Sequence, residues 1–170
     1  EALRAAGIRE LRAVRLLGSG ATAASALLAV SQLGAERVVV SARTPANAKE
    51  LEGLAAELGL RLVVQPLDAR QGSQLPDAVI STIPGGAGHT MTFRDETMSS
   101  AILLDVAYDP WPTPLAAAWL AAGGRVLSGL EMLLHQALGQ VRIFVGGDPG
   151  VRLPEEASVL AAMRQSVEFD

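Results

Sequence analysis

The chain contains no cysteine, so neither a disulfide nor a metal site with thiolate ligands can form within its 170 residues. Only two histidines occur, His89 and His135, and no spacing typical of metal ligands surrounds either one. Aromatic residues make up 4% of the chain, too few for a platform on which nucleic-acid bases stack. No apolar run is long enough to cross a bilayer, and the first residues lack the charged and apolar regions of a signal peptide.

The overall charge and size narrow the class of protein further. A formal net charge of -4 argues against general binding to nucleic acid. The apolar share of 49% is enough for a sizeable core in one ordinary domain. Together with the missing cysteines, these features indicate a cytoplasmic protein that binds neither nucleic acid nor membrane.

Short apolar runs alternate with helical patterns along the chain. Valine and isoleucine dominate several of the runs without a clean polar alternation, which is typical of strands covered on both faces in a parallel sheet. This order predicts an α/β fold of three layers, with a doubly wound, mainly parallel, Rossmann-like sheet. The predicted strands are residues 13–17, 37–41, 62–64, 78–81, 102–106 and 125–127, and the predicted helices are 21–33, 45–58, 114–122 and 129 to about 140.

Local signals place several helix ends. Thr44 before Pro45 and Thr113 before Pro114 each predict an N-cap followed by proline at the first helical position. Residues 85–100 are polar and irregular, which predicts a loop with a short helix. A loop over 146–154 and a last amphipathic helix over 154–165 are also predicted. Glycines mark three predicted helix ends, at Gly34, Gly59 and Gly123.

A glycine turn joins the first predicted strand to the first long helix, and its pattern is G-x-G-x-x-A, a dinucleotide-binding fingerprint. The first glycine allows a tight turn, the second lets the backbone approach a diphosphate, and the alanine lets the helix pack against its strand. The helix N-terminus then faces the phosphates. The alternative is a glycine turn that binds nothing. The candidate residues are Gly18, Ser19, Gly20, Ala21, Thr22 and Ala23.

The end of the second predicted strand indicates which dinucleotide is bound. An acidic residue there binds the ribose of NAD, whereas a basic residue accommodates the 2′-phosphate of NADP. The chain has no acid at this point but has Arg43, followed by Thr44. The guanidinium of Arg43 can hold a phosphate and stack on adenine, and the hydroxyl of Thr44 can donate. The alternative is that Arg43 is a solvated loop charge.

Four segments, in order, resemble the cofactor-binding half of shikimate dehydrogenases. The family has a clamp of Asn-Arg-Thr for the adenosine phosphate, where this chain has Ala42, Arg43 and Thr44. The family commonly has a basic residue four positions after that arginine, where this chain has Asn47. The family also has an N-x-T-P stretch after the fourth strand, where residues 81–84 of this chain read Ser-Thr-Ile-Pro. The four segments are the turn 18–23, the clamp 42–44, Asp-Val-Ala-Tyr-Asp-Pro over 105–110 with Thr-Pro-Leu over 113–115, and Gly-Leu-Glu-Met-Leu-Leu-His-Gln-Ala over 129–137.

The resemblance implies NADP as the cofactor and assigns roles to further residues. The backbone around Val106 and Gly129 would hold the nicotinamide, with Met132 packed near it, and Tyr108 and Gln136 would face shikimate. Without the resemblance, Met132 reads as a core residue and Tyr108 as a packing residue. We expect His89 and His135 to have no catalytic role and Asp105 to be structural. Three residues follow the C-terminal end of the fourth predicted strand, where α/β sheets bind ligands, and are candidates to contact the cofactor: Thr82, Ile83 and Pro84. The alternative is a simple turn.

The resemblance further implies a substrate domain ahead of this chain. That domain would carry the catalytic Lys and Asp, so no catalytic residue is expected here. Residues 1–12 would be the tail of a linker helix, 13–150 the NADP-binding domain, and 151–170 a helix that packs back toward the substrate domain. Apolar surface on that helix would favour association, so a homodimer is one expectation.

The expected reaction is the reversible NADPH-dependent reduction of 3-dehydroshikimate to shikimate in aromatic amino acid biosynthesis. Three alternatives remain open: a quinate/shikimate dehydrogenase paralogue that uses NAD, a non-catalytic dinucleotide-binding module, and a scaffold that binds no ligand.

Overall fold

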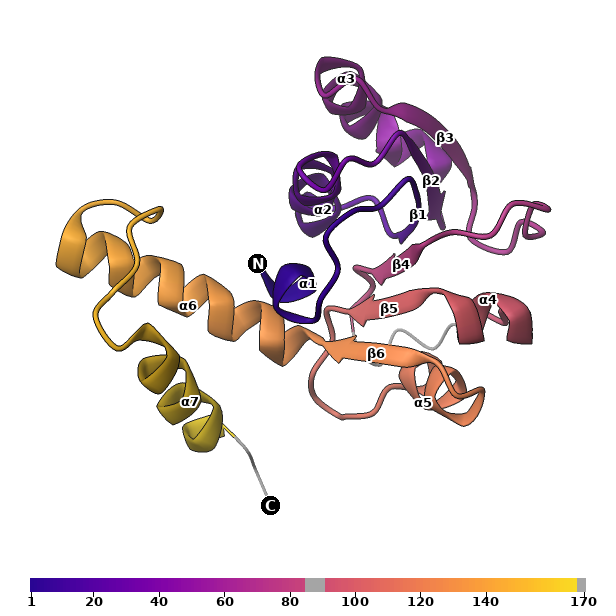
Figure 1. The fold of residues 1–170 in the computed structure, drawn as a ribbon. Coiled ribbons are helices and arrows are strands. Elements are labelled where there is room, and N and C mark those ends of the chain that lie inside the picture. Colours follow the sequence, from indigo (N-terminus) through magenta and orange to yellow (C-terminus); the bar gives the residue numbers. More distant parts are fainter. Residues whose placement is uncertain (85–90, 168–170) are drawn as a thin grey trace.

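The structure, a computed structural model, describes residues 1–84 and 91–167 and is built around a six-stranded parallel sheet (Figure 1). The strands lie in the order β3-β2-β1-β4-β5-β6, which is the order of the doubly wound dinucleotide-binding fold. The predicted fold class is confirmed. Within the described ranges, no helix is both long and apolar enough to span a bilayer.

The strands are β1 (Ala13–Leu17), β2 (Arg37–Ala42), β3 (Arg61–Pro66), β4 (Ala78–Ser81), β5 (Ile102–Asp105) and β6 (Arg125–Ser128). The helices are α1 (Ala2–Ala5), α2 (Ala21–Ser31), the 3₁₀ helix η1 (Pro45–Ala48), α3 (Lys49–Glu57), α4 (Asp95–Ser100), α5 (Pro114–Ala121), α6 (Gly129–Gly146) and α7 (Glu156–Val167).

Apolar side chains lie on both faces of the sheet, so it carries two separate cores. The alternation along a strand sends Leu16 of β1 to one face, where it packs with α2 and α3. Leu17 points to the other face, toward α4 and α5, where Trp119 is fully buried. The indole N–H of Trp119 donates to the carbonyl of Ala101 at 3.0 Å, which ties α5 to the start of β5. The predicted three-layer arrangement therefore follows from residues that are apolar on both sides of the same strands.

The two predicted threonine N-caps have different outcomes. Thr113 caps α5 as predicted, because its hydroxyl accepts from the amide of Ala116 at 3.1 Å. Thr44 is the N-cap residue of η1 with Pro45 at the start of the helix, as predicted, but its side chain makes no capping bond. The amide of Asn47 donates instead to the main-chain carbonyl of Thr44 at 3.0 Å, which closes a 3₁₀ turn. The predicted helix 45–58 therefore begins as η1 and continues as α3.

The helix termini are where the sequence prediction is least accurate. The helix predicted to end near residue 140 continues to Gly146, and Gly147 ends it at a φ of +73°. The expected linker helix over 1–12 is helical only at α1, after which Gly7 turns the chain at a φ of +87°. The predicted short helix within 85–100 is confirmed as α4, and residues 85–90 lie outside the described part. The remaining strand and helix boundaries agree with their predicted ends or shift by one or two residues.

A buried carboxylate fixes the loop that follows β5. Asp105 is 2% exposed, and its Oδ2 accepts the hydroxyl proton of Thr113 at 2.6 Å. Its Oδ1 accepts from the amide of Ala107 at 3.3 Å. Since Thr113 also caps α5, one side chain joins the end of β5 to the start of that helix. These contacts are consistent with the structural role expected for Asp105.

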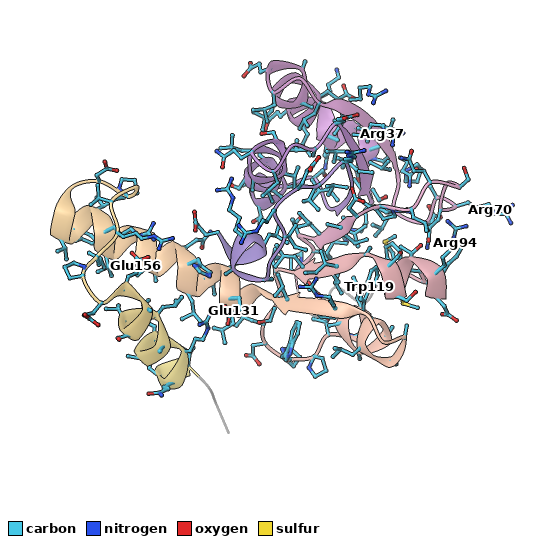
Figure 2. The ribbon with its side chains drawn as sticks, in the orientation of Figure 1. Arg37, Arg70, Arg94, Trp119, Glu131 and Glu156 are labelled. Atoms are coloured by element: carbon cyan, nitrogen blue, oxygen red, sulfur yellow. The ribbon has the colours of Figure 1, made fainter. Side chains whose placement is uncertain are left out.

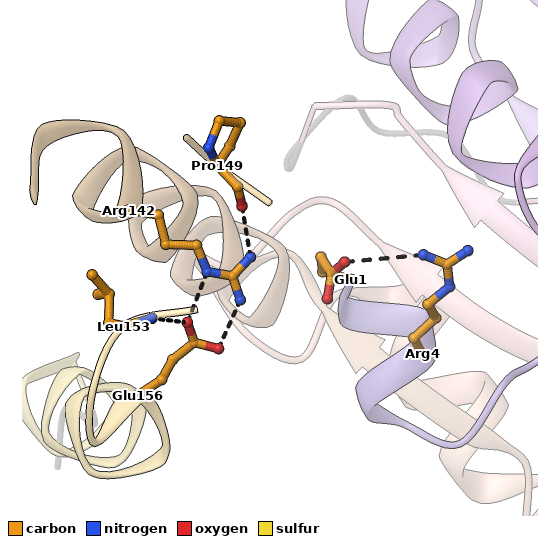
Figure 3. A network of polar contacts seen from close by, with 6 residues as sticks. All are labelled: Glu1, Arg4, Arg142, Pro149, Leu153 and Glu156. Carbon is orange, nitrogen blue, oxygen red and sulfur yellow. Dashed lines mark hydrogen bonds and ion pairs between the residues drawn. The ribbon is translucent and has the colours of Figure 1, made fainter. Parts of the chain in front are cut away.

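Helices α6 and α7 form an arm beside the sheet and are joined by two arginine–carboxylate pairs (Figure 1). Figure 3 shows that Arg142 of α6 donates hydrogen bonds to both carboxylate oxygens of Glu156, which are 2.8 and 2.7 Å long. Glu156 also accepts from the amide of Leu153 at 3.1 Å. Further along, Arg164 of α7 binds both oxygens of Glu131 at 2.9 and 2.7 Å. Since α7 has no buried residue, these two pairs are its main polar attachment to α6.

Replacing Thr113 by valine should destabilise the protein by about 2 kcal/mol, because the change removes an N-cap and leaves the Asp105 carboxylate short of a donor. Urea unfolding followed by circular dichroism measures this loss. The matched control is Thr44→Val, at the Thr-Pro pair whose hydroxyl caps nothing, and we expect a loss below about 0.5 kcal/mol there. Equal losses for the two variants would contradict the assigned cap.

Acid should weaken the attachment of α7. The bidentate bond from Arg142 lowers the pKa of Glu156 to about 2. A carboxylate whose pKa is lower in the folded state contributes stability above its unfolded pKa and loses that contribution as the pH falls toward its folded pKa. The melting temperatures of wild type and Glu156→Gln should therefore differ most above pH 4.5 and converge toward pH 2. Glu155→Gln is the control, and a difference that stays constant over this range would refute the pairing.

Candidate dinucleotide-binding site

The turn after β1 brings three parallel strands together. The amide of Gly18 donates to the carbonyl of Ser41 in β2 at 2.9 Å. Gly18 has a φ of +102°, and a Cβ on it would overlap the hydroxyl of Thr82, which follows β4. That hydroxyl donates to the carbonyl of Leu17 at 2.8 Å. Only glycine fits this position, since any side chain would meet Thr82 in a strained backbone conformation.

The N-terminus of α2 faces open space. Gly20 is the N-cap, and nothing lies within 4 Å of the place where its Cβ would be. Among the described residues, no acceptor is found for the amides of Ala21 and Thr22. Ala23 is fully buried, so the helix lies close to the sheet. A helix N-terminus with free amides and no obstructing side chain is suited to an anion.

A cavity of about 570 Å³ opens beside this turn. It is lined by Ala21 and Thr22 of α2, by Val106 after β5, and by Met132 and Gln136 of α6. Ligands of doubly wound sheets bind at the carboxyl ends of the strands, where one end of this cavity lies. The cavity extends from there along α2 to Gln32 and Leu33 and to α1. The structure therefore brings together five of the residues that the sequence placed in one site.

Gly129 also belongs to this group, through direct contact with the loop after β5. Its amide donates to the carbonyl of Ala107 at 3.2 Å, and a Cβ on it would overlap the carbonyl group of Val106. The start of α6 and the loop at Val106 are thus packed backbone against backbone. This contact fixes the position of Met132 one turn further along α6.

His135 lines the same cavity and carries a polar atom without a partner. Its Nε2 is buried and has no hydrogen-bond partner among the described residues. Burial, chiefly, lowers the pKa of His135 below its usual value. The imidazole is therefore neutral at pH 7, where this nitrogen can take part in one hydrogen bond with a ligand. The expectation for His89 lies outside the described residues.

Other predicted site residues lie away from this cavity. Arg43 is exposed and lines a separate, larger hollow of about 1020 Å³. Thr44 is exposed beside it in sequence, at the start of η1. Ser19 lies in the turn itself, Ile83 packs against the core of Trp119, and Pro84 is exposed. Tyr108 is 51% exposed and lines none of the cavities described here.

The sequence analysis missed one group of charged residues. Arg15 is 6% exposed in the middle of β1, and it lines the hollow of Arg43 together with Arg70 and Arg94. The signal that could have revealed it is a single arginine within the apolar run Ala-Val-Arg-Leu-Leu. A charged side chain at the centre of a buried strand needs a reason, because burial of an unpaired charge is costly.

No family model matches the chain. It is 34% identical over 146 residues to the shikimate dehydrogenase (NADP(+)) of Caulobacter vibrioides, which covers 82% of this chain and 50% of that protein. A shikimate 5-dehydrogenase from Mycobacterium fortuitum superimposes with a TM-score of 0.74 at 35% identity, over 92% of this chain and 57% of that one. The Thermus thermophilus enzyme in complex with NADP(H) and shikimate gives a TM-score of 0.69 at 28% identity, over 98% and 59%.

The chain spans about half the length of the shikimate dehydrogenases that it matches. The sequence identity covers 82% of the chain, and the common fold covers 92% of it. The resemblance seen in the four segments is thus confirmed. The chain belongs to the shikimate dehydrogenase family and corresponds to the C-terminal half of its members.

Proposed function

We propose that the chain is the NADP-binding part of a shikimate dehydrogenase, which reversibly reduces 3-dehydroshikimate to shikimate in aromatic amino acid biosynthesis. The observation that carries this proposal is the cavity that joins the open N-terminus of α2 to Val106 and Met132. One end of it is suited to a diphosphate and the other to an apolar ring. The relatives named as NADP(+)-dependent supply the reaction.

The diphosphate would lie on the N-terminal turn of α2. The free amides of Ala21 and Thr22 can donate to it, and the helix dipole favours its negative charge. The open space at Gly20 leaves room for the backbone to approach a phosphate. Gly18, Ser19 and Ala23 shape the turn, and Thr82, Ile83 and Pro84 would border it from the end of β4.

The adenosine end would lie at the end of β2. Residues 41–48, at and after the end of β2, include no carboxylate to bind a free ribose hydroxyl, and Arg43 is exposed with its guanidinium available to the 2′-phosphate of NADP. Thr44 can donate its hydroxyl to the same group. These two residues favour NADP over NAD.

The nicotinamide end would lie between the backbones of Val106 and Gly129, with Met132 beside the ring. When bound, NADP supplies the acceptor of the hydride that leaves the carbinol carbon of shikimate. Gln136, on the wall of the same cavity, and Tyr108, in the following loop, would orient the substrate. The proton of the hydroxyl would go to the Lys and Asp of the preceding substrate domain.

The same proposal divides the chain into parts. Residues 1–12 would connect to the substrate domain, 13–150 would bind NADP, and 151–170 would pack toward the substrate domain. The end of α6 supports a contact there, since Phe144 is 87% exposed and Val145 71%. A second copy of the chain could cover the same surface in a homodimer. We place the whole enzyme in the cytoplasm, in keeping with a chain that has no cysteine.

The whole protein should form NADPH from NADP when shikimate is added, as followed by absorbance of the reduced cofactor. Replacing Gln136 by leucine should lower kcat/KM for shikimate about tenfold, because one hydrogen bond to the substrate is lost, and leave NADPH affinity unchanged. Oxidation of quinate with NAD but not of shikimate would favour the NAD-dependent paralogue. Binding without any turnover would favour a non-catalytic module.

Arg43→Ala should weaken NADPH binding about tenfold or more, because a charge-assisted hydrogen bond to the 2′-phosphate is lost. Binding of NADH should change less than about twofold. Isothermal titration calorimetry measures both. Arg9→Ala removes the same charge at another exposed position and serves as the control. An equal loss for the two cofactors would refute the role of Arg43 in selecting NADP.

A further inference from the structure

One sheet face has no helix over part of its width. The connection from β3 to β4, residues 67–77, contains no helix. The side of β1, β2 and β3 that faces away from α2 and α3 is covered instead by irregular chain, because residues of the β3–β4 connection and of the segment before α4 line hollows over it. Val63 of β3 points to this side and is 57% exposed, whereas Arg15 of β1 is 6% exposed beside Phe93. The cover is therefore incomplete, and hollows remain over the strands.

Arginines line the two hollows on this face. The larger hollow, of about 1020 Å³, contains Arg15, Arg43, Arg70 and Arg94 in its wall. The smaller, of about 170 Å³, shares Arg15 and Arg94 and adds Arg37. Among the described residues that line either hollow, Asp68 is the single carboxylate. The hollows therefore carry a strong excess of positive charge in a protein whose net charge is negative.

Arg15 is the least satisfied of these cations. Its Nε donates to the hydroxyl of Ser41 at 3.3 Å, and its guanidinium lies 5.4 Å from the ring centroid of Phe93. Its Nη2 is buried and has no hydrogen-bond partner in the described part of the chain. Burial lowers the pKa of Arg15, since the charged form is held away from water. A buried guanidinium with no counterion is a costly arrangement that an anion would relieve.

The segments that carry the other arginines are held in place. Gln71 donates to the carbonyl of Thr92 at 2.8 Å, and Arg94 donates to the carbonyl of Gly72 at 2.9 Å. The β3–β4 connection is thus fastened to the segment before α4, and Figure 2 shows Arg70 and Arg94 on the same side of the molecule. In the described part of the chain, no ion pair joins any of these arginines to a carboxylate. The guanidinium of Arg94 is therefore held in place, whereas Arg70 is exposed.

We propose that this hollow binds a phosphate monoester dianion, with Arg70 and Arg94 at its rim and Arg15 beneath it. Convergent guanidinium groups match the charge and the several acceptor oxygens of a phosphate better than those of a single carboxylate. Two sources fit this chemistry. One is the 2′-phosphate of NADP, which Arg43 would share with the hollow, and this source rests on the proposed function. The other is a free phosphate, which does not.

The test compares three probes on the purified protein: inorganic phosphate, 2′,5′-ADP and adenosine, which carries no phosphate, by calorimetry and thermal shift at constant ionic strength. Arg70→Gln should weaken binding of a phosphate-bearing probe about tenfold and leave the binding of adenosine unchanged. Arg15→Leu should abolish the rise in melting temperature caused by that probe, and should itself raise the melting temperature in phosphate-free buffer. The control, Arg9→Gln, should bind all three probes as the wild type does.

The pattern of losses identifies the source. If Arg70→Gln weakens the binding of both inorganic phosphate and 2′,5′-ADP, the site takes free phosphate. If it weakens the binding of 2′,5′-ADP alone, the ligand is the 2′-phosphate of the nucleotide. Binding of every probe by Arg70→Gln and Arg15→Leu as by the wild type overturns the proposal. So does a wild type that binds no inorganic phosphate and binds 2′,5′-ADP no more tightly than adenosine. If Arg15→Leu does not fold, Arg70→Gln decides.

The two proposals fail separately. If NADPH does not bind but inorganic phosphate binds and is lost in Arg70→Gln, the proposed cofactor function is wrong and the phosphate site stands. If NADPH binding depends on Arg43, but Arg70→Gln and Arg15→Leu bind inorganic phosphate and 2′,5′-ADP as the wild type does, the cofactor function stands and the phosphate site is wrong.

Discussion

The close approach of Gly18 to Thr82 is the constraint on which the rest of the site depends. The turn after β1 bonds to β2 through Ser41, and the segment after β4 bonds back to the end of β1 through Thr82. Both bonds require that no side chain stand at position 18. Because the three strand ends are fixed there, α2 begins at one defined place with its amides facing outward. The direction of a helix N-terminus is thus set by a backbone contact between strands that are 65 residues apart.

A second backbone contact does the same for the other end of the cavity. The start of α6 lies against the carbonyl of Val106, and the loop after β5 is held by the Asp105–Thr113 bond. Neither contact involves a side chain that reaches into the cavity. The site is shaped by supporting residues behind it, which leaves Met132 and Gln136 free to meet a ligand.

Much of the fold could be predicted from the sequence, because the information is local. Runs rich in valine and isoleucine gave five of the strands almost to the residue, and the Thr113-Pro114 pair gave the start of α5. Thr44 begins η1 as predicted but without a side-chain cap, because a 3₁₀ turn bonds the amide of Asn47 to its main-chain carbonyl. The end of α6 was missed although residues 141–145, apolar apart from Arg142, continue the helical pattern up to Gly147, where the helix ends. The 3₁₀ turn has no sequence signature of its own, whereas the glycine that stops α6 is visible in the sequence.

The arginine-lined hollow could not be predicted, because it depends on strand order. The sequence shows that residues 67–77 lack a helical pattern, but only the arrangement β3-β2-β1-β4 reveals that the face without a covering helix there is the one that holds Arg15. Under a packed helix, this side chain would lie in an apolar core with no route to a counterion, at a cost on the order of several kcal/mol. Beneath the irregular segments of this face it lies beside two hollows whose walls contain four other arginines. The burial of Arg15 therefore favours a site that binds an anion. A bound anion would compensate the charge of the buried guanidinium and offset the free-energy cost of burying it.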